Sequence, residues 1–225
     1  MSKPSLIWAC PCYGDIDPQV LGSHLAAMAH ATEVSTITHV GITDRVMVAA
    51  ARQRIAEEAL EKDADYIFWA DSDVILPSGV VARLLGHRKE ITSGLYFQRY
   101  APHWPLMMSR VPDKHYKAEE AHNWVAVWPR GLIAVGAVGF GCVLVATQIF
   151  RNIAKPWFVY DEKGGEDVRF CVMARQAGYQ VFVDTEVVCG HLGDRPAITE
   201  INYETYIKDH PELLDGKLSE VQFMP

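Results

Sequence analysis

The segment YIFWADSDVILP, residues 66–77, decides the fold class of this chain. Its first five residues, Tyr66–Ala70, are apolar and mostly bulky, which is typical of a central parallel strand buried on both faces. Asp71-Ser72-Asp73 follows at once, at the carboxyl end of that strand. In an open α/β sheet this end faces the ligand crevice, so the segment predicts a central strand with a polar site beside it.

Strands and helices alternate along most of the chain. The predicted strands are Ser5–Cys10, Val34–Val40, Tyr66–Ala70, Glu90–Phe97 and Gln180–Asp184. The predicted helices are Pro18–His30, Arg45–Lys62, Val80–Gly86 and Glu166–Ala177. Because strands that alternate with helices pair in parallel, the pattern predicts an α/β fold built on a parallel sheet.

The length and composition of the chain favour a single domain. Its 225 residues are 49% hydrophobic and 22% charged, which excludes a disordered polar segment and permits one sizeable core. We expect a domain over residues 1–195 and a polar C-terminal tail, residues 196–225, that packs on or near it.

Charge and cysteine content restrict the partners and the compartment. The formal net charge of -7 disfavours broad contact with nucleic acid or an anionic membrane. Five cysteines, an odd number, indicate reduced thiols, and we expect a cytoplasmic location. Residues 131–150 carry no charge, but glycines interrupt them, so they predict a buried strand, a turn and a helix start rather than a membrane span.

Residues 98–130 lack sustained periodicity and predict a long loop or an irregular hairpin. This segment contains the aromatic and imidazole side chains of His103, Trp104, His122, Trp124 and Trp128. Such side chains can stack on a sugar or a base, or form a lid over the core. The sequence leaves both interpretations open.

Asp71 and Asp73 are candidates for binding a ligand. On an extended chain, positions i and i+2 point to the same side, so the two carboxylates are predicted to converge beside the strand end. Such a pair suits a hard divalent cation next to a phosphate. The alternative, which the motif leaves open, is a solvated turn at the end of the strand.

Glu166 and Asp167 follow the Gly164-Gly165 pair at the start of a predicted helix. At that position they can be first-turn charges that complement the helix dipole. Alternatively, the helix start can keep a carboxylate ionised as a general base for a bound hydroxyl. Spacing does not decide between these roles.

Arg52 and Arg54 lie two positions apart on a predicted helix, so only one of them can face the crevice. An arginine there would bind phosphate through charge-assisted hydrogen bonds, whereas an exposed one would pair with Glu57 or Glu58. His191 lies between glycines after the last predicted strand, where an imidazole can reach a ligand. A lone histidine is, however, more often an ordinary polar contact.

Taken together, these segments resemble a nucleotide-sugar glycosyltransferase of the GT-A fold, in the family-2-like group with many bacterial and phage members. The resemblance rests, in the family's order, on residues 9–14 (ACPCYG), 51–54 (ARQR), 66–77, 135–145 (VGAVGFGCVLV), 165–178 (GEDVRFCVMARQAG) and His191. It covers most of the chain. It implies a Rossmann-like, mixed, mostly parallel sheet flanked by helices.

The resemblance also implies a site for the nucleotide-sugar. Its residues would be Pro11, Tyr13, Arg52, Asp71 and Ser72. Pro11 and Tyr13 would border the base, and Arg52 would approach the diphosphate or the ribose. Where many family members have Arg-Asn, this chain has Arg52-Gln53.

The same resemblance implies a cation and an acceptor site. Asp73 and His191, with Asp71 on the ribose or on the metal, would hold Mn²⁺ or Mg²⁺. Asp167, with Glu166 beside it, would bind or deprotonate the acceptor hydroxyl. The implied activity is transfer of a sugar from a UDP- or GDP-sugar to an acceptor, with the stereochemical outcome left open.

The acceptor class also stays open, because a glycan, a small molecule, a protein or a modified DNA base all fit this fold. The Q-x-x-R-W signature of processive synthases is absent, so a non-processive enzyme is expected. Three alternatives remain. They are a haloacid-dehalogenase-like phosphatase that uses Asp71 and Asp73, a sugar nucleotidyltransferase, whose G-x-G-T-R-type loop this chain lacks, and a non-catalytic nucleotide- or glycan-binding module.

Overall fold

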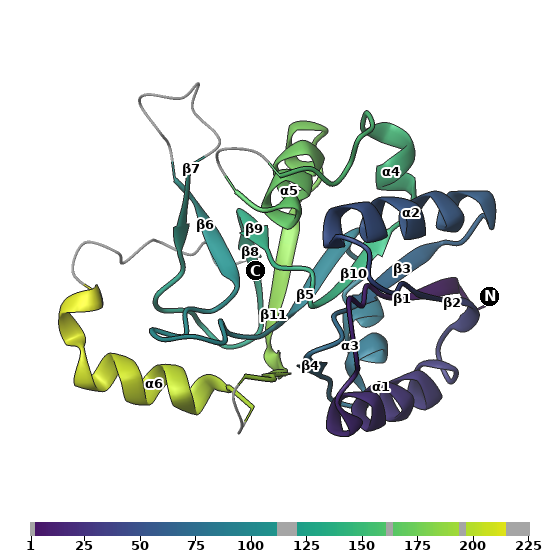
Figure 1. The fold of residues 1–225 in the computed structure, drawn as a ribbon. Helices are drawn as coiled ribbons and strands as arrows, with labels where there is room; N and C mark the ends of the chain where they lie inside the picture. Colours follow the sequence, from purple (N-terminus) through teal and green to yellow (C-terminus); the bar gives the residue numbers. More distant parts are fainter. Residues whose placement is uncertain (1–2, 112–120, 161–163, 194–196, 215–225) are drawn as a thin grey trace.

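The structure of the chain is a computed structural model that describes residues 3–111, 121–160, 164–193 and 197–214. The strands of its main sheet are β1 (Ser5–Cys10), β2 (Thr36–Ile42), β3 (Tyr66–Ala70), β5 (Ile91–Leu95), β8 (Leu132–Val135), β10 (Cys142–Ala146) and β11 (Val181–Val188). Their order across the sheet is β2-β1-β3-β10-β5-β11-β8 (Figure 1).

Most strands of this sheet share one direction. β1 pairs in parallel with β2 and β3, and β5 pairs in parallel with β11. β10 lies antiparallel between β3 and β5, and β8 is antiparallel to β11. The sheet is therefore mixed and mostly parallel, which confirms the expected fold class.

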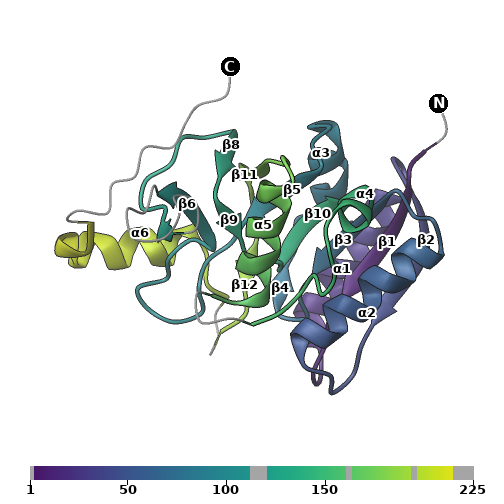
Figure 2. The ribbon, with the colours of Figure 1, turned by 90° about the horizontal axis from the view of Figure 1, so that it is seen from above.

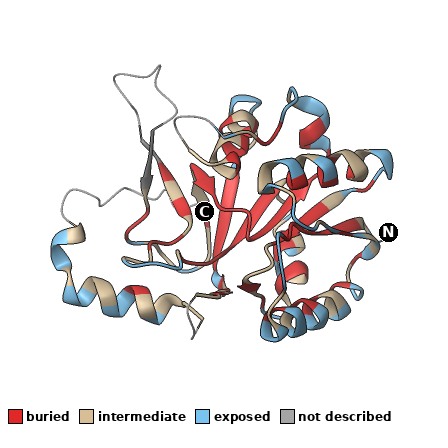
Figure 3. Ribbon diagram, viewed as in Figure 1, coloured by how far each residue is buried: buried red, intermediate tan, exposed pale blue. Residues whose placement is uncertain are grey.

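Helices cover both faces of the sheet (Figures 1 and 2). They are α1 (Pro18–Ala31), α2 (Val48–Glu61), α3 (Val80–Gly86), α4 (Gln148–Asn152) and α5 (Glu166–Gln176). On β3, Phe68 and Ala70 pack in one cluster with α1 and α3, whereas Ile67 and Trp69 pack in the other with α2, α4 and α5. Burial on both faces, visible in Figure 3, explains why this strand lacks polar positions.

Several boundaries differ from the predicted ones. Helix α2 begins at Val48 rather than Arg45, whose φ of 52° is left-handed and cannot continue a right-handed helix. Strand β11 ends at Val188 rather than at Asp184. Its pairing with β5 has a register irregularity between Asp184 and Val188, which the sequence did not indicate. Strands β1 and β3 have the predicted bounds.

Residues 98–130 contain part of a small second sheet. Strands β6 (Met107–Val111) and β7 (Ala121–Trp124) are antiparallel, and β6 also pairs with β9 (Ala137–Val138). Of the two predicted alternatives, the structure has a hairpin, whose tip lies outside the described residues. The uncharged segment 131–150 supplies β8, β9, β10 and α4. No helix among the described residues is long and apolar enough to cross a membrane.

The chain after residue 196 contains α6 (Glu200–Asp209) and a 3₁₀-helix, η1 (Pro211–Leu214), neither of which was predicted. Tyr203 of α6 is buried against the rings of Phe97, Trp104 and Trp128. Its hydroxyl donates to the carbonyl of Ala126 at 2.7 Å. Of the predicted stacking tryptophans, Trp104 is therefore buried and Trp128 packs, partly buried, against the core, which fits the lid interpretation.

The other three candidates in that segment have different surroundings. Trp124 packs, partly buried, against the core. The Nδ1 atom of His103 lies 3.0 Å from the carbonyl oxygen of Gln98. The side chain of His122 lies outside the described part of the structure.

A last, two-stranded pairing positions the site. Strand β4 (Val74–Ile75) is antiparallel to β12 (Gly190–His191), and His191 is the register partner of Val74. The backbone N–H of Leu192 also donates to the carbonyl of Asp73 at 2.7 Å. These bonds place residue 191 directly beside the turn that follows β3.

Candidate functional site

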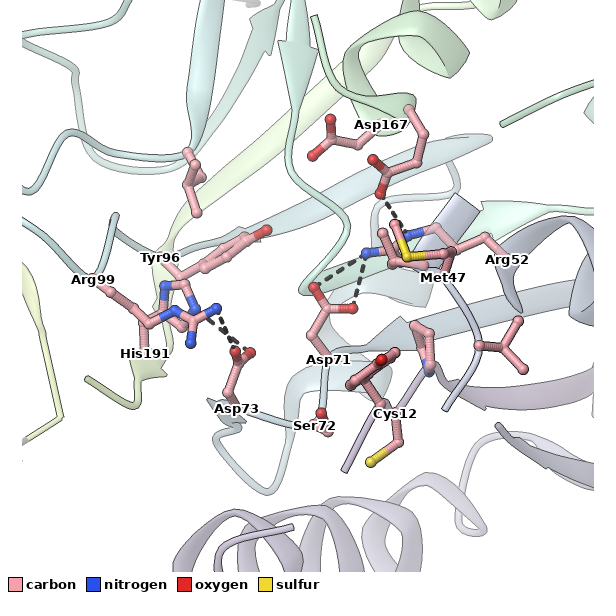
Figure 4. A pocket seen from close by; sticks show the side chains of 16 residues that line it. Cys12, Met47, Arg52, Asp71, Ser72, Asp73, Tyr96, Arg99, Asp167 and His191 are labelled. Carbon is pink, nitrogen blue, oxygen red and sulfur yellow. Dashed lines mark hydrogen bonds and ion pairs between the residues drawn. The ribbon is translucent and has the colours of Figure 1, made fainter. Parts of the chain in front are cut away.

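One cavity of about 450 Å³ lies at the carboxyl ends of β1 and β3 (Figure 4). All of the predicted site residues contribute to its lining, namely Pro11, Tyr13, Arg52, Asp71, Ser72, Asp73, Glu166, Asp167 and His191. They come from loops after β1 and β3, from helices α2 and α5, and from β12. The crevice rule for open α/β sheets therefore located the cavity correctly.

The D-x-D motif forms a turn rather than an extended segment. β3 ends at Ala70, and the N–H of Val74 donates to the carbonyl of Asp71 at 3.1 Å. In this turn Asp71 points toward Arg52, and Asp73 points toward Arg99 and His191 (Figure 4). Both carboxylates line one cavity beside the strand end, as expected, but they bind different partners, because the extended geometry ends at Ala70.

Asp71 is held by a buried arginine. Nη2 of Arg52 donates to both carboxylate oxygens of Asp71, at 2.9 and 3.1 Å. Nη1 of Arg52 donates to the carbonyl of Phe140 at 3.3 Å, and its guanidinium lies over the rings of Trp69 and Phe140. The Arg52 side chain is only 3% exposed, so this pair is a fixed part of the cavity wall.

Arg54 lies outside the cavity. Its side chain is 70% exposed and pairs with Glu58, one helical turn away, at 3.6 Å. The two arginines are therefore separated as their helical spacing predicts.

Glu166 and Asp167 have different surroundings although they are adjacent. Oε1 of Glu166 accepts from Nε of Arg52 at 3.2 Å, which ties the start of α5 to α2. Asp167 lines the cavity, and its Oδ1 accepts the N–H of Val168 at 2.7 Å. Burial, reinforced by the charge of Glu166, raises the pKa of Asp167 to about 6. The helix start therefore does not hold this pKa down, because desolvation outweighs it.

Asp73 faces two other groups. Its Oδ2 lies 3.0 Å from Nη2 of Arg99, and its Oδ1 lies 3.5 Å from Nε2 of His191. Burial acts to raise the pKa of Asp73, but His191 and Arg99 outweigh it and hold this pKa below its ordinary value. The Asp73 carboxylate is thus ionised at neutral pH and available to a cation.

A backbone carbonyl on the side of the ring away from Asp73 fixes the orientation of His191. Its Nδ1 lies 2.6 Å from the carbonyl oxygen of Phe97, and because a carbonyl only accepts, Nδ1 must carry the proton. Nε2, the nitrogen that faces Asp73, is then the one that can either donate to this carboxylate or bind a cation. An N–H held by a backbone carbonyl is the usual support of a metal-binding histidine.

Asp73 and His191 therefore fit a divalent cation. A lone pair and a carboxylate oxygen 3.5 Å apart repel each other unless a proton or a cation lies between them. Within the described residues, no group of three or more His, Cys, Asp or Glu side chains is gathered for a metal. A cation held by this pair would complete its coordination with water or with phosphate oxygens of a ligand, as Mg²⁺ commonly does.

Tyr96 supplies a neutral hydroxyl to the cavity. This hydroxyl accepts the N–H of Gly141 at 2.8 Å, and burial together with Asp71 and Asp167 raises the Tyr96 pKa well above its ordinary value. The hydroxyl end of the ring points to the side of the cavity where Asp71 and Asp167 lie (Figure 4). Glycine is required at position 141 because a Cβ there would lie 2.8 Å from the Tyr96 ring.

Pro11, Tyr13 and Ser72 form the rim on the β1 side. Pro11 is buried, whereas Tyr13 is 67% exposed and lies at the mouth of the cavity. A large exposed aromatic ring at such a mouth is suited to contact a flat ligand group.

Sequence analysis missed several lining residues, namely Cys12, Val46, Met47, Val48, Tyr96, Arg99 and Leu106. Tyr96 and Arg99 follow β5, whose carboxyl end opens onto the same crevice as that of β3. The rule that located Asp71 would have found them if it had been applied to this strand as well. Nothing in the local sequence marks Leu106 or residues 46–48.

Comparison with known proteins supports the fold. No protein-family model matches the chain. Procollagen-lysine,2-oxoglutarate 5-dioxygenase from Drosophila melanogaster is 26% identical over 166 residues, which are 72% of this chain but only 22% of that relative. A197 from STIV superimposes with a TM-score of 0.57 at 17% identity, covering 88% of this chain and 91% of its own. This chain therefore shares its fold with A197.

GalNAc-T7, solved with UDP, GalNAc and Mn²⁺, superimposes with a TM-score of 0.49 at 13% identity. The superposition covers 92% of this chain and 47% of GalNAc-T7.

Proposed function

We propose that this chain is a metal-dependent glycosyltransferase of the GT-A type that moves a sugar from a nucleotide-diphosphate sugar to an acceptor hydroxyl. The observation that carries the proposal is that one cavity contains both a pair of side chains suited to a cation and a separate carboxylate suited to a proton. Asp73 and His191 face each other as a cation site, while Asp167 is a separate carboxylate with a pKa of about 6. A sugar transfer needs these two functions side by side.

The charge of the cavity favours a bound cation. Four carboxylates, those of Asp71, Asp73, Glu166 and Asp167, line it together with two guanidinium groups. A diphosphate would be repelled by this excess of negative charge. A divalent cation at Asp73 and His191 would remove the repulsion and attract the diphosphate to the same place. Carboxylate and imidazole together favour Mn²⁺, and Mg²⁺ is the alternative.

The residues around the cation site would hold the donor. When bound, the cation would act as a Lewis acid that stabilises the negative charge of the departing nucleoside diphosphate. Tyr13 and Pro11 would border the base, and Ser72 and Asp71 would lie near the ribose. Arg52, whose guanidinium already binds three protein groups, would contribute its positive charge from the cavity wall.

Asp167 would act on the acceptor. In a direct displacement the acceptor oxygen bonds to the anomeric carbon, the bond from that carbon to the diphosphate oxygen breaks, and Asp167 takes the acceptor proton. A base with a pKa of about 6 is ionised at neutral pH and still able to hold the proton. Tyr96 would donate its hydroxyl hydrogen to a sugar or acceptor oxygen. Glu166 would keep Arg52 and the start of α5 in position.

The phosphatase alternative requires Asp71 as a free nucleophile. Both carboxylate oxygens of Asp71 accept hydrogen bonds from Arg52, which lowers their nucleophilicity. The geometry therefore favours the transferase. Within the proposal, the enzyme is family-2-like and non-processive, the donor is a UDP- or GDP-sugar, and the acceptor class is open.

The test is a panel of UDP- and GDP-sugars incubated with the chain and Mn²⁺, with released nucleotide and transferred sugar both measured. We expect turnover of at least one donor, its loss with EDTA and its return with Mn²⁺. Asp73→Asn should abolish it, and His39→Ala, at a half-exposed position outside the cavity, is the control. Binding of nucleotide without release from any donor would instead support the binding module.

A further inference from the structure

Arg99 is the cationic side chain that faces the proposed metal ligand. It follows β5, its side chain is 45% exposed, and it lines the same cavity as Asp73. Its Nη2 lies 3.0 Å from Oδ2 of Asp73. Within the described residues, this ion pair is the polar contact that the structure gives to its guanidinium.

The other cavity arginine is held in a different way. Arg52 is 3% exposed, and Asp71, Glu166 and the carbonyl of Phe140 all accept from it. Moving Arg52 would leave two carboxylates without their partner in the protein interior, which is costly. Arg99 can turn away from Asp73 into water at little cost, because exposed pairs contribute little.

A divalent cation and Arg99 compete for the same carboxylate. The cation site defined above uses Asp73 and the Nε2 atom of His191, and Arg99 occupies the other oxygen of Asp73. The two positive charges would lie within a few ångströms of each other and repel. Binding of the cation therefore favours release of Arg99.

A released Arg99 would still lie at the edge of the cavity that it lines, within reach of a diphosphate bound to the cation. A guanidinium group donates two parallel hydrogen bonds to a phosphate, which makes arginine well suited to this ligand. The same side chain can thus serve two anions in turn.

We propose that Arg99 is an exchangeable counter-ion, which neutralises Asp73 in the empty site and binds the donor diphosphate once the cation has displaced it. This inference rests on the proposed function for the identity of the diphosphate. It gives removal of Arg99 two effects of opposite sign. Cation binding without nucleotide should become tighter, and nucleoside diphosphate binding with the cation should become weaker.

The experiment measures binding rather than turnover. Mn²⁺ affinity is determined by electron paramagnetic resonance without nucleotide, and UDP and GDP affinities by calorimetry at saturating Mn²⁺. The variants are Arg99→Ala, Arg99→Lys and Asp73→Asn. Arg54→Ala is the matched control, because it removes an exposed arginine outside the cavity.

We expect Arg99→Ala to bind Mn²⁺ roughly three- to tenfold more tightly, because one competing charge is removed. Its affinity for the better diphosphate should fall by about tenfold or more, because a charge-assisted contact is lost. Arg99→Lys should restore Mn²⁺ affinity to the wild-type value but recover the diphosphate only in part. Arg54→Ala should change neither.

The possible results separate the two proposals. Unchanged or weaker Mn²⁺ binding by Arg99→Ala, with binding still lost in Asp73→Asn, would overturn the counter-ion and leave the cation site standing. Mn²⁺ binding that does not depend on Asp73 would overturn both. Opposite effects on Mn²⁺ and diphosphate in a protein that transfers no sugar would retain the counter-ion and reject the transferase.

Discussion

Asp71 and Asp73 belong to one turn, yet the structure gives them opposite environments. Asp71 is bound through both oxygens by Arg52, an arginine buried between α2 and the sheet. Asp73 faces a half-exposed Arg99 and the Nε2 atom of His191. One side of the D-x-D motif is therefore part of the protein's framework, and the other side is available for ligands. A motif of two like residues does not imply two like functions.

The largest effect is expected at Asp167, the proposed general base, which lines the same cavity near Asp71 and Arg52. Asp167→Asn should lower sugar transfer by roughly 10²- to 10⁴-fold, the usual contribution of a general base, while donor affinity stays within a fewfold. Glu166→Gln should lower transfer less, because Glu166 binds Arg52. Steady-state transfer rates and donor titration on both variants test this. Normal transfer by Asp167→Asn would exclude it as the base.

The same carboxylate should also give a pH signature. Its folded-state pKa of about 6 lies above the ordinary value of 3.8, so the folded chain binds the proton more tightly than the unfolded chain. This contribution to stability is present below pH 4 and is lost as pH rises through 6. Asp167→Asn should therefore gain stability relative to wild type between pH 4 and 7. Chemical denaturation across that range checks it, and a difference that stays constant with pH would contradict it.

Arg52 should matter for stability where Arg99 does not. Arg52→Ala leaves Asp71 and Glu166 without their partner, which should cost about 3–5 kcal/mol of unfolding free energy, or roughly 6–20 °C in melting temperature. Arg99→Ala, like the control Arg54→Ala, should stay within about 1 kcal/mol. Thermal and urea unfolding of the three variants measure this. Equal losses for Arg52 and Arg99 would remove the contrast between the two sides of the motif.

The variant His191→Ala tests the proposed cation site while leaving the carboxylate of Asp73 in place. His191→Ala should weaken Mn²⁺ binding by roughly 10- to 100-fold, because a nitrogen ligand with a fixed orientation is lost. His39→Ala, a half-exposed histidine at the outer edge of the sheet, should leave the affinity unchanged. Mn²⁺ titration by electron paramagnetic resonance reports both. Unchanged Mn²⁺ affinity in His191→Ala would exclude His191 as a ligand of the cation.

The smallest effect is expected at Tyr96, which lines the same cavity as Asp71 and Asp73. Tyr96→Phe keeps the ring that packs over Gly141 and removes one hydroxyl, so transfer should fall by about three- to tenfold, the value of one hydrogen bond. Tyr203→Phe is the control, because it removes a buried hydroxyl far along the chain that donates to Ala126. Only the first variant should change transfer. Equal transfer by both would leave the Tyr96 hydroxyl with a structural role.

The sequence by itself determined the sheet and the place of the cavity. The unbroken apolar run of Tyr66–Ala70 gave the central strand with its bounds, because a strand covered on both faces tolerates no polar position. The rule that ligands bind at the carboxyl ends of parallel strands then placed Asp71 and Asp73 at the edge of the sheet where the structure has the cavity. Helical spacing alone separated Arg52 from Arg54.

Only the tertiary structure decided what each of these residues contacts. Asp71 meets Arg52, 19 positions earlier, and Asp73 meets His191 because β12 pairs with β4. Such contacts depend on register and on the turn after β3, which no local pattern encodes. The pKa of Asp167 likewise follows from burial against Glu166 and not from its place at a helix start. Local sequence sets periodicity and propensity, whereas desolvation and charge pairing arise only when distant segments pack together.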